Sequence, residues 1–373
     1  MVMKKFFLPF LALVGATTLF QGCIKSSTSI DESQVIQTPY SLFFTDNSGA
    51  MFVSNDGIRY KTVVASDGYP DHALITDGAN IVRIKKNIMT STNNGATFNF
   101  SYGPPDLAAE GFVDALGNSK TLNQSMIINI PKWGHTYVAS REITTGQNYF
   151  GMAGSVAGSI YLSWGPQNFY DTIEVIDASR PVWVTSFTST KSDTLFAFSA
   201  ITQTTMYRSG PANTWAKTYA TTPIPLDSTK AWYSLGHIGN RIIVIDNKGT
   251  AVANGGSPAY YSDDRGNSWI AYSGLPSGTP LNCISTPFEQ ICLVGTEGKG
   301  LYTLNMNTNT FQRIGNGLPA DCVVRNIAFK ENIYKNGNKK QYVYVATNSG
   351  IYQSTDLGFN FVKTIPGNYT TIY

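Results

Sequence analysis

The chain has 373 residues and a formal net charge of +3, and only 14% of its residues are charged. So small a net charge argues against a nucleic-acid-binding protein, which would carry a strongly basic surface. An apolar content of 42% is enough to build a core, so the chain as a whole is not intrinsically disordered. Aromatic residues at 13%, together with 34 glycines, favour strands and tight turns, and we expect an all-β fold.

The first 22 residues have the pattern of a bacterial secretory signal. Lys4 and Lys5 form a basic start, and an apolar run follows from Phe6 to Phe20. The next residues, Gln-Gly-Cys23, resemble the cleavage box of bacterial, Bacteroidetes-like lipoproteins, in which the cysteine is acylated and becomes the mature N-terminus. The alternative is ordinary secretion with a spare cysteine.

This pattern predicts three consecutive segments. Residues 1–22 are expected to be a lipoprotein signal peptide, and residues 23–36 a flexible, Ser/Thr-rich tether that begins at the lipid-bearing Cys23. Residues 37–373 are expected to form a single domain. The predicted location is the bacterial cell envelope, with a lipid anchor in the outer membrane or at the cell surface.

Three further cysteines follow in the body of the chain. Cys283 and Cys292 lie in two apolar runs joined by a short turn, so a hairpin would let them face each other, either as a disulfide or as buried thiols. Cys322 has no evident partner. The three histidines are scattered, and neither a CxxC nor an HExxH spacing occurs, so we expect no metal site and no cofactor.

A turn motif recurs along the body of the chain. Its full form is Ser-x-Asp/Asn-x-Gly-x-Ser/Thr/Asn followed by an aromatic residue, and it occurs from Ser91 to Phe98, from Ser262 to Trp269 and from Ser354 to Phe361. Weaker copies end at Tyr60, Phe169, Trp215 and Phe311. Most of the intervals between closing aromatic residues are about 40–50 residues long, which is the period of propeller blades.

The residue types of the motif suit a hairpin turn between the third and fourth strands of a blade. The hydroxyl and the carboxylate or amide satisfy backbone N–H groups of the turn, and the glycine permits a positive φ. The aromatic residue packs between blades. We therefore interpret the following residues as structural rather than catalytic: Ser91, Asn93, Gly95, Phe98, Ser262, Asp264, Gly266, Trp269, Ser354, Asp356, Gly358 and Phe361.

The motif resembles the Asp-box (BNR) repeat of sialidases, xyloglucanases, sortilin-type receptors and photosystem assembly-factor propellers. The resemblance implies a sialidase-like β-propeller. Counting the copies gives seven blades, with residues 368–373 supplying the first strand of blade one and closing the ring without exposed edges. The long interval before Phe169 is interpreted as blade three plus insertions, because residues 102–123 lack paired strand runs.

Three insertions are expected to be long loops on the face where the innermost strands begin, at residues 102–123, 141–158 and 247–258. Propeller ligands usually bind at this face, and long loops on a rigid scaffold often carry function. Each polar residue there can also be a solvated rim side chain. The ligand-binding candidates are Asp106, Glu110, Asp114, Arg141, Glu142, Tyr149, Arg180 and Trp232.

Two functions of different classes fit this pattern. One is a non-enzymatic, surface-anchored binding or assembly module for a glycan or an envelope protein. The other is an exo-α-sialidase-like glycoside hydrolase, for which the resemblance implies an arginine cluster and a tyrosine nucleophile with a glutamate partner. The residues available for that role are Arg141, Arg180, Arg325, Glu142 and Tyr149.

Sequence features favour the binding module, with no catalytic residues. The Arg-Ile-Pro signature of sialidases is missing near the first blade, and sialidases have six blades rather than seven. A xyloglucanase-like hydrolase would need a second propeller, for which the chain is too short.

Replacing Cys23 tests the lipid anchor. We expect a Cys23→Ala chain, produced in a bacterium that acylates lipoproteins, to move from the membrane pellet to the soluble fraction, because lipid is the only anchor that the sequence predicts. Fractionation with immunoblotting measures this. Retention of the variant in salt-washed membranes would show that something other than lipid holds the protein there.

Overall fold

The computed structural model describes residues 35–37, 42–71, 73–76, 81–84, 88–91, 93, 95–100, 112–113, 119–120, 122–130, 135–142, 148–156, 159–166, 186–189, 194–199, 204–209, 216–222, 224, 233–246, 257–334 and 338–373. The chain divides into two compact units. The main unit comprises residues 40–329 and 342–373. The small unit comprises residues 1–39 and 330–341.

The described chain is almost entirely β-structure, which confirms the all-β prediction. Its one helical element among the described residues is the 3₁₀ turn η2 (Pro287–Glu289). No helix in this part of the chain is long and apolar enough to cross a membrane.

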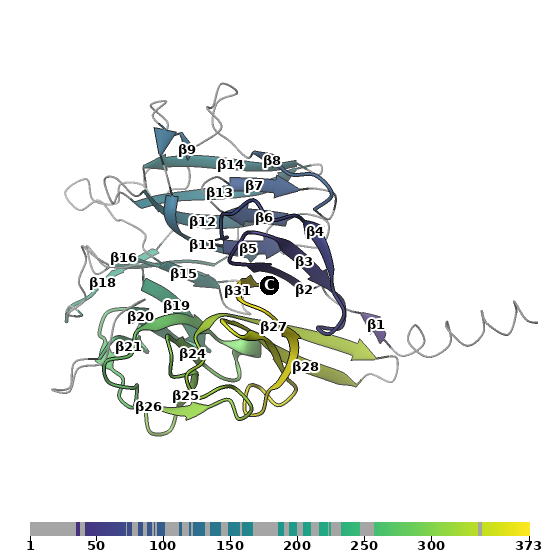
Figure 1. The fold of residues 1–373 in the computed structure, drawn as a ribbon. Coiled ribbons are helices and arrows are strands. Elements are labelled where there is room, and N and C mark those ends of the chain that lie inside the picture. The colour runs from purple at the N-terminus through teal and green to yellow at the C-terminus, as the bar shows by residue number, and fades with distance from the viewer. Residues whose placement is uncertain are drawn as a thin grey trace, which may run out of the picture. The chain divides into compact units, whose positions relative to one another are not determined.

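The described strands form six four-stranded sheets, one five-stranded sheet and one two-stranded sheet. We number the larger sheets 1 to 7 in chain order, and Figure 1 labels many of their strands. Sheet 1 contains β31 (Tyr369–Ile372), β2 (Leu42–Asp46), β3 (Met51–Ser54) and β4 (Lys61–Val64). Sheet 2 contains β5 (Ala73–Thr76), β6 (Ile81–Ile84), β7 (Ile88–Ser91) and β8 (Asn99–Phe100). Sheet 3 contains β11 (Leu122–Ile130), β12 (His135–Glu142), β13 (Asn148–Val156) and β14 (Ser159–Pro166). Sheet 4 contains β15 (Ser186–Ser189), β16 (Thr194–Ser199), β17 (Thr204–Ser209) and β18 (Ala216–Tyr219).

The remaining strands follow the same plan. Sheet 5 contains β19 (Tyr233–Ile238), β20 (Arg241–Asp246), β21 (Ala259–Ser262) and β22 (Ile270–Ala271). Sheet 6 contains β23 (Leu281–Ser285), β24 (Leu293–Thr296), β25 (Leu301–Asn305) and β26 (Thr310–Ile314). Sheet 7 contains β27 (Val324–Tyr334), β28 (Lys339–Thr347), β29 (Gly350–Ser354) and β30 (Val362–Pro366), and β1 (Val35–Gln37) pairs with β27 as its fifth strand. The two-stranded sheet consists of β9 (Phe112–Val113) and β10 (Ser119–Lys120).

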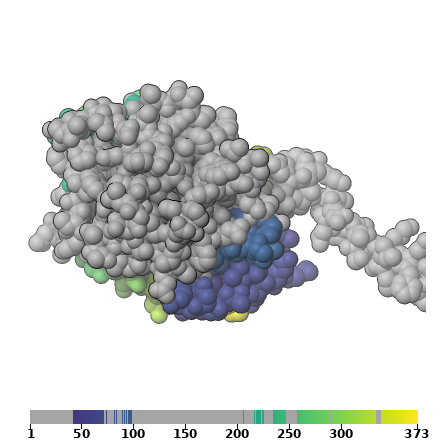
Figure 2. Space-filling view, turned by 90° about the horizontal axis from the view of Figure 1, so that it is seen from above, coloured from purple at the N-terminus to yellow at the C-terminus, as the bar shows by residue number. Residues whose placement is uncertain are grey.

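Sheet 1 combines strands from both ends of the main unit. β31 pairs antiparallel with β2, so that Phe44 lies opposite Ile372. Two backbone hydrogen bonds of 2.8 Å join Phe43 and Tyr373 in both directions. The purple N-terminal and yellow C-terminal residues accordingly lie side by side in Figure 2. The C-terminal segment therefore supplies the first strand of sheet 1.

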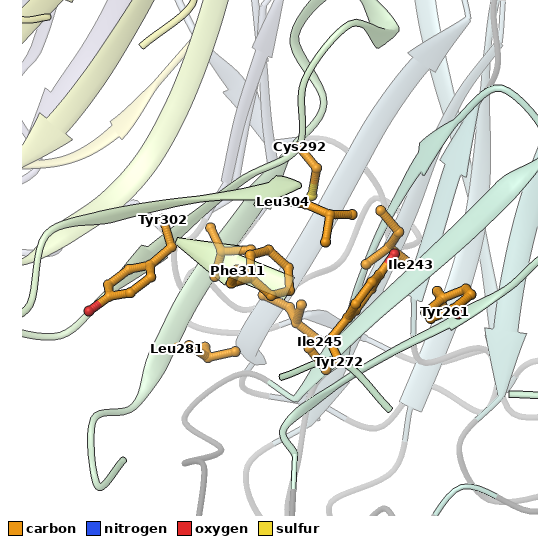
Figure 3. Packing of buried hydrophobic residues seen from close by; sticks show 11 residues of the cluster. Ile243, Ile245, Tyr261, Tyr272, Leu281, Cys292, Tyr302, Leu304 and Phe311 are labelled. Atoms are coloured by element: carbon orange, nitrogen blue, oxygen red, sulfur yellow. The ribbon is translucent and has the colours of Figure 1, made fainter. Parts of the chain in front are cut away.

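The middle strand β20 is apolar over most of its length because both faces of sheet 5 are covered. In β20, Ile242 and Val244 pack in one cluster of sheet 5 side chains, whereas Ile243 and Ile245 pack in a second cluster shared with sheet 6. Figure 3 shows this second cluster, in which Phe311 of sheet 6 takes part. Since successive side chains of a strand point to opposite faces, a continuous apolar run serves two interfaces at once.

β28 follows the same rule. Its Val343 and Val345 pack with sheet 6, and the intervening Tyr344 packs with sheet 1. The fourth strands are more exposed, as the pattern of β30 shows, where only Ile365 is fully buried. Burial of a branched aliphatic side chain contributes about 1.5–3 kcal/mol, so the sheet-to-sheet interfaces hold most of the core.

A buried ion pair connects sheets 1 and 2. Arg83 on β6 donates from Nε to Asp71 Oδ1 at 3.0 Å and from Nη2 to Asp71 Oδ2 at 2.8 Å. Their side chains are 1% and 0% exposed. Nη2 of Arg83 also donates to the Gly49 carbonyl, in the turn between β2 and β3, at 2.8 Å. The arginine thus ties a turn of sheet 1 to the second strand of sheet 2.

Two expectations about insertions are wrong. Residues 102–123 do contain paired strands, because β9 and β10 form an antiparallel pair and β11 begins at Leu122. Residues 141–158 are mostly strand rather than loop, since β12 extends to Glu142 and β13 occupies Asn148–Val156. Glycines in this stretch suggested a loop, but they lie within the ladder, where Gly151 and Gly154 pair with residues of both neighbouring strands.

The buried pair should matter far more than an exposed one of similar geometry. We expect Asp71→Asn to lower the free energy of unfolding by about 3–5 kcal/mol, because it leaves the Arg83 charge buried without a counter-ion. The matched control is Asp263→Asn, which breaks the bidentate pair with Arg241, whose aspartate side chain is 57% exposed; there we expect about 1 kcal/mol or less. Urea unfolding at pH 7 measures both. Equal losses in the two variants would contradict this account.

Candidate functional site

The turn motif forms a defined hydrogen-bond network, clearest at the copy that begins at Ser262. Ser262 Oγ donates to Asp264 Oδ1 at 2.8 Å and accepts from the Gly266 N–H at 2.7 Å. Asp264 Oδ1 also accepts from the Ser268 N–H at 2.9 Å. Trp269 closes the turn by donating from Nε1 to the Gly266 carbonyl at 3.1 Å. The polar side chains of the motif are therefore engaged within the turn.

The other two full copies repeat this network. In each, the serine hydroxyl accepts from the glycine N–H, and the Asp or Asn oxygen accepts from the N–H four residues later. The bonds join Ser91, Asn93, Gly95 and Thr97 in one copy, and Ser354, Asp356, Gly358 and Asn360 in the other. The closing Phe361 is buried between sheets 6 and 7, and Phe98 packs against the cluster between sheets 1 and 2.

The glycine of each motif lies against the neighbouring sheet. A Cβ on Gly266, which has φ +88°, would lie 1.9 Å from Thr205 Oγ1 on β17 of sheet 4. In the weaker copy of sheet 1, a Cβ on Gly57 would lie 2.5 Å from the Tyr344 ring of sheet 7. Both the backbone angle and the lack of space require glycine there.

The turn carboxylates stay ionised at low pH. Burial by itself raises the pKa of Asp264, but hydrogen bonds from Ser268, from Ser262 and from Asn267 outweigh it and hold the pKa at about 2. The pKa of Asp356 is also lowered: burial opposes this, and hydrogen bonds from Asn360 and Ser354 prevail. A general acid needs a proton to donate near neutral pH, so the lowered pKa values suit a structural turn and not a general acid.

A different set of polar groups meets where three first strands begin. Asn282, the second residue of β23, donates from Nδ2 to the carbonyl of Val324, the first residue of β27, at 3.1 Å. Arg325 follows Val324 and donates from Nη1 to Asn368 Oδ1 at 2.7 Å, just before β31. A longer contact of 3.5 Å reaches the Tyr369 carbonyl. We call the five residues named here the strand-start site.

The charge of Arg325 has no counter-ion among the residues that the structure describes. Its hydrogen-bond partners are an amide oxygen and a carbonyl, both neutral, and its side chain is half-buried. A guanidinium has five N–H donors in a fixed plane, and here Nη1 alone is bound within the described part of the chain. An arginine held in place by neutral acceptors is suited to receive a carboxylate or another planar anion.

Three candidates predicted from the sequence lie in sheet 3, at the end of the sheet where its first strand, β11, begins. Glu142 is opposite Leu122, the first residue of β11, and Arg141 is opposite Asn148. Tyr149 follows on β13, opposite Ser140. The remaining five candidates lie outside the described residues. They are Asp106, Glu110, Asp114, Arg180 and Trp232. The lipidation candidate Cys23 also lies outside them.

First strands of successive sheets contact one another. β31 contacts β5, β5 contacts β11, and the series continues through β15 and β19 to β23. The first strands of sheets 1 to 6 are therefore consecutive neighbours, and the strand-start site lies at the starts of two of them, β23 and β31, and of β27.

Sequence reasoning missed two asparagines of the strand-start site: Asn368, which accepts from Arg325, and Asn282, which donates to the Val324 carbonyl. Asn282 and Asn368 follow the turn residues Pro280 and Gly367 by one or two positions, so a polar residue just after a blade connection was the available signal.

A second missed signal is the repeated sequence Ser/Asn-Gly-Leu-Pro, which begins at Ser273 and at Asn316. In both copies the first residue accepts from the closing aromatic of the next sheet, as in the 2.8 Å bond from the Phe311 N–H to the Ser273 carbonyl.

The cysteines in the described residues are free thiols. Cys292 belongs to the cluster between sheets 5 and 6, whereas Cys283 packs against the cluster on the other face of sheet 6. The disulfide alternative is therefore not realised. Burial raises the pKa of the Cys322 thiol to about 11, so it stays protonated. No group of three metal-ligating side chains occurs in the part of the chain that the structure describes.

No family model matches the chain, and neither does any curated protein. Among solved structures, a 6-phosphogluconolactonase-like protein of Bacteroides uniformis has a TM-score of 0.51 at 10% identity, over 92% of this chain and 99% of that one. YCF48 bound to a D1 peptide has a TM-score of 0.46 at 10% identity, over 83% and 91%. The Bacteroides uniformis protein, whose TM-score exceeds 0.5, is a β-propeller protein. The fold is a β-propeller.

A third similar structure is the extracellular domain of BT4673 from B. thetaiotaomicron, with a TM-score of 0.46 at 10% identity. The match covers 88% of this chain but only 45% of BT4673's domain. At such identities the likeness concerns the fold alone, and the propeller's function must be argued from its own residues.

The role of the turn carboxylates can be tested with Asp264→Asn. Asparagine holds the same position in the copy at Asn93 and accepts the same bond, so we expect near-native stability at pH 7. The pKa of Asp264 is about 2 in the folded chain and about 3.9 when unfolded. Its ionisation therefore stabilises the native fold above pH 4, and that contribution is lost as the pH falls through 2. Urea titrations from pH 7 to 2 should show a smaller acid-dependent loss in the variant. An unchanged acid dependence, or collapse at pH 7, would contradict the turn assignment.

Proposed function

We propose that the chain is a lipid-anchored, non-enzymatic binding module of the bacterial cell envelope. Its scaffold is a seven-bladed Asp-box propeller, in which sheets 1 to 7 are the blades and β31 closes the ring. Its strand-start site receives an acidic group of a glycan or of an envelope protein.

Contacts between sheets 1 and 7 support the closed ring. Phe44 and Tyr369 of sheet 1 share one buried cluster with Tyr344 and Ile351 of sheet 7. The turn of sheet 1 approaches the same tyrosine through Gly57, and Gln353 Nε2 of sheet 7 lies 3.4 Å from the Asp56 carbonyl. These contacts are equivalent to those between consecutive sheets elsewhere in the main unit, such as that of Gly266 with sheet 4.

The binding role rests on one observation: the guanidinium of Arg325 is oriented, and it has no counter-ion within the described ranges. Asn368 already fixes Nη1, so an incoming carboxylate does not have to order a free side chain, which reduces the entropic cost of binding. The ligand supplies the negative charge that the described neighbours of Arg325 do not. Acidic sugars and acidic protein side chains both carry such a carboxylate.

The experiment compares two substitutions at Arg325 in the mature full-length chain. Binding to a glycan array and to immobilised acidic peptides is measured at low and at high salt. A charge-assisted hydrogen bond contributes about 1.5–3 kcal/mol, so Arg325→Ala should weaken binding by about tenfold or more, and Arg325→Lys, which keeps the charge but not the planar fork, should retain part of it.

The matched control is Arg59→Ala, because this arginine is 92% exposed on the turn of sheet 1 and pairs with Asp56. Binding that survives Arg325→Ala unchanged would refute the proposed site. Turnover of a sialoside reporter that Arg325→Ala abolishes would replace the binding role with the hydrolase.

A further inference from the structure

The small unit contains an extended hairpin. β27 has eleven residues and β28 has nine, whereas the corresponding strands β23 and β24 have five and four. The extra length belongs to the small unit, as residues 330–341. We call these residues the hairpin extension.

Side chains brace the two strands of the hairpin extension. Glu331 on β27 accepts from Lys339 Nζ at 3.0 Å through Oε1, and from Gln341 Nε2 at 3.1 Å through Oε2. One carboxylate thus holds two positions of β28. The extension is therefore a preformed template and does not depend on a further strand to keep its two strands together.

The edge of β27 that does not face β28 accepts a third strand. β1 pairs antiparallel with it, with Val35 opposite Tyr334 and Gln37 opposite Ile333. The register shifts between these two pairs, so the ladder is short and irregular. An unpaired strand edge is a ready template for another extended segment, and two residue pairs hold such a segment only weakly.

Charge favours this pairing as well. Residues 330–341 contain four lysines against a single glutamate. The sequence directly before β1 carries Asp31 and Glu32, and no lysine or arginine lies between residues 26 and 58. An acidic segment and a basic hairpin attract each other, and this attraction weakens with salt.

We propose that the β27 edge of the hairpin extension is a strand-acceptor site, and that its resident occupant is the chain's own β1 segment, residues 35–37, bound in cis as a releasable strap. The recognition is by backbone pairing, with an acidic pair ahead of a short apolar strand supplying the preference. This inference does not rest on the proposed function.

The test uses the full mature chain and a fluorescent peptide of residues 29–38. Ile36→Pro removes a backbone donor from β1 and disfavours its pairing, which frees the acceptor edge. We expect the peptide to bind the Ile36→Pro chain at least tenfold more tightly than the native chain, where the strap competes. A peptide with Asp31→Asn and Glu32→Gln should bind more weakly, and 0.5 M salt should reduce the difference between the two peptides.

Two measurements keep the test independent of peptide affinity. Backbone amides of residues 331–334 should exchange more slowly with deuterium in the native chain than in the Ile36→Pro chain, while the melting temperature of the main unit stays the same. A Val35→Cys/Tyr334→Cys chain should form a disulfide within one molecule, since opposed residues of an antiparallel pair lie within disulfide reach.

Two results would contradict the proposal, one for the acceptor site and one for its occupant. Equal peptide binding to the native and Ile36→Pro chains, or none to either, together with unchanged exchange, would overturn the acceptor site. Disulfide-linked dimers in place of linked monomers would overturn the cis occupant and assign the edge to a second copy of the chain.

Discussion

The close approach of each turn motif to the neighbouring sheet is the constraint on which the rest of the fold depends. Gly266 and Gly57 have positive φ angles, and a Cβ on either would overlap a side chain of the adjacent sheet. The turn can approach so closely because its polar groups are satisfied internally, by Ser262 and Asp264 in the first case. Neighbouring sheets are thereby brought close together at these turns, and alternate side chains of β20 pack on both faces of sheet 5.

The polar groups of the turn motifs and those of the strand-start site differ in how fully they are paired. At the turn motifs, donors and acceptors saturate one another, and the lowered pKa of Asp264 reflects that saturation. At the strand-start site, Asn368 orients Arg325, and none of the residues that the structure describes neutralises its charge. A side chain whose position is fixed and whose charge is left over is where an interaction with another molecule gains most.

Structural features that repeat along the chain could be predicted from the sequence, whereas features that occur only once could not. The spacing of motifs around Ser91, Ser262 and Ser354 predicts an all-β chain of four-stranded sheets, because every copy marks the same hairpin turn between two strands. The pair of Asp71 and Arg83 occurs once, and its meaning depends on the fold bringing the Gly49 turn beside it. Local composition misled the interpretation of residues 141–158, since Gly151 and Gly154 of β13 lie within a regular strand ladder and not in a loop.

The site was only partly predictable for the same reason. Arg325 was a candidate because it follows a blade connection, but Asn282 and Asn368 are recognisable only once β23, β27 and β31 begin side by side. Arg141, Glu142 and Tyr149 share one end of sheet 3 by register. Whether their side chains act with Arg325 stays a prediction, as do the roles of Asp106, Glu110, Asp114, Arg180 and Trp232.

The pairing of β31 with β2 has a consequence for how the chain acquires its fold. Thr45 Oγ1 and Thr371 Oγ1 lie 2.7 Å apart although 326 positions separate them in the chain. Sheet 1 therefore lacks its first strand until residues 369–372 have been synthesised, and one edge of β2 has no native partner before then. Contacts of such sequence separation form slowly, and an exposed edge invites aggregation. Sheet 1 is thus completed only after the strands of all the other sheets have been made.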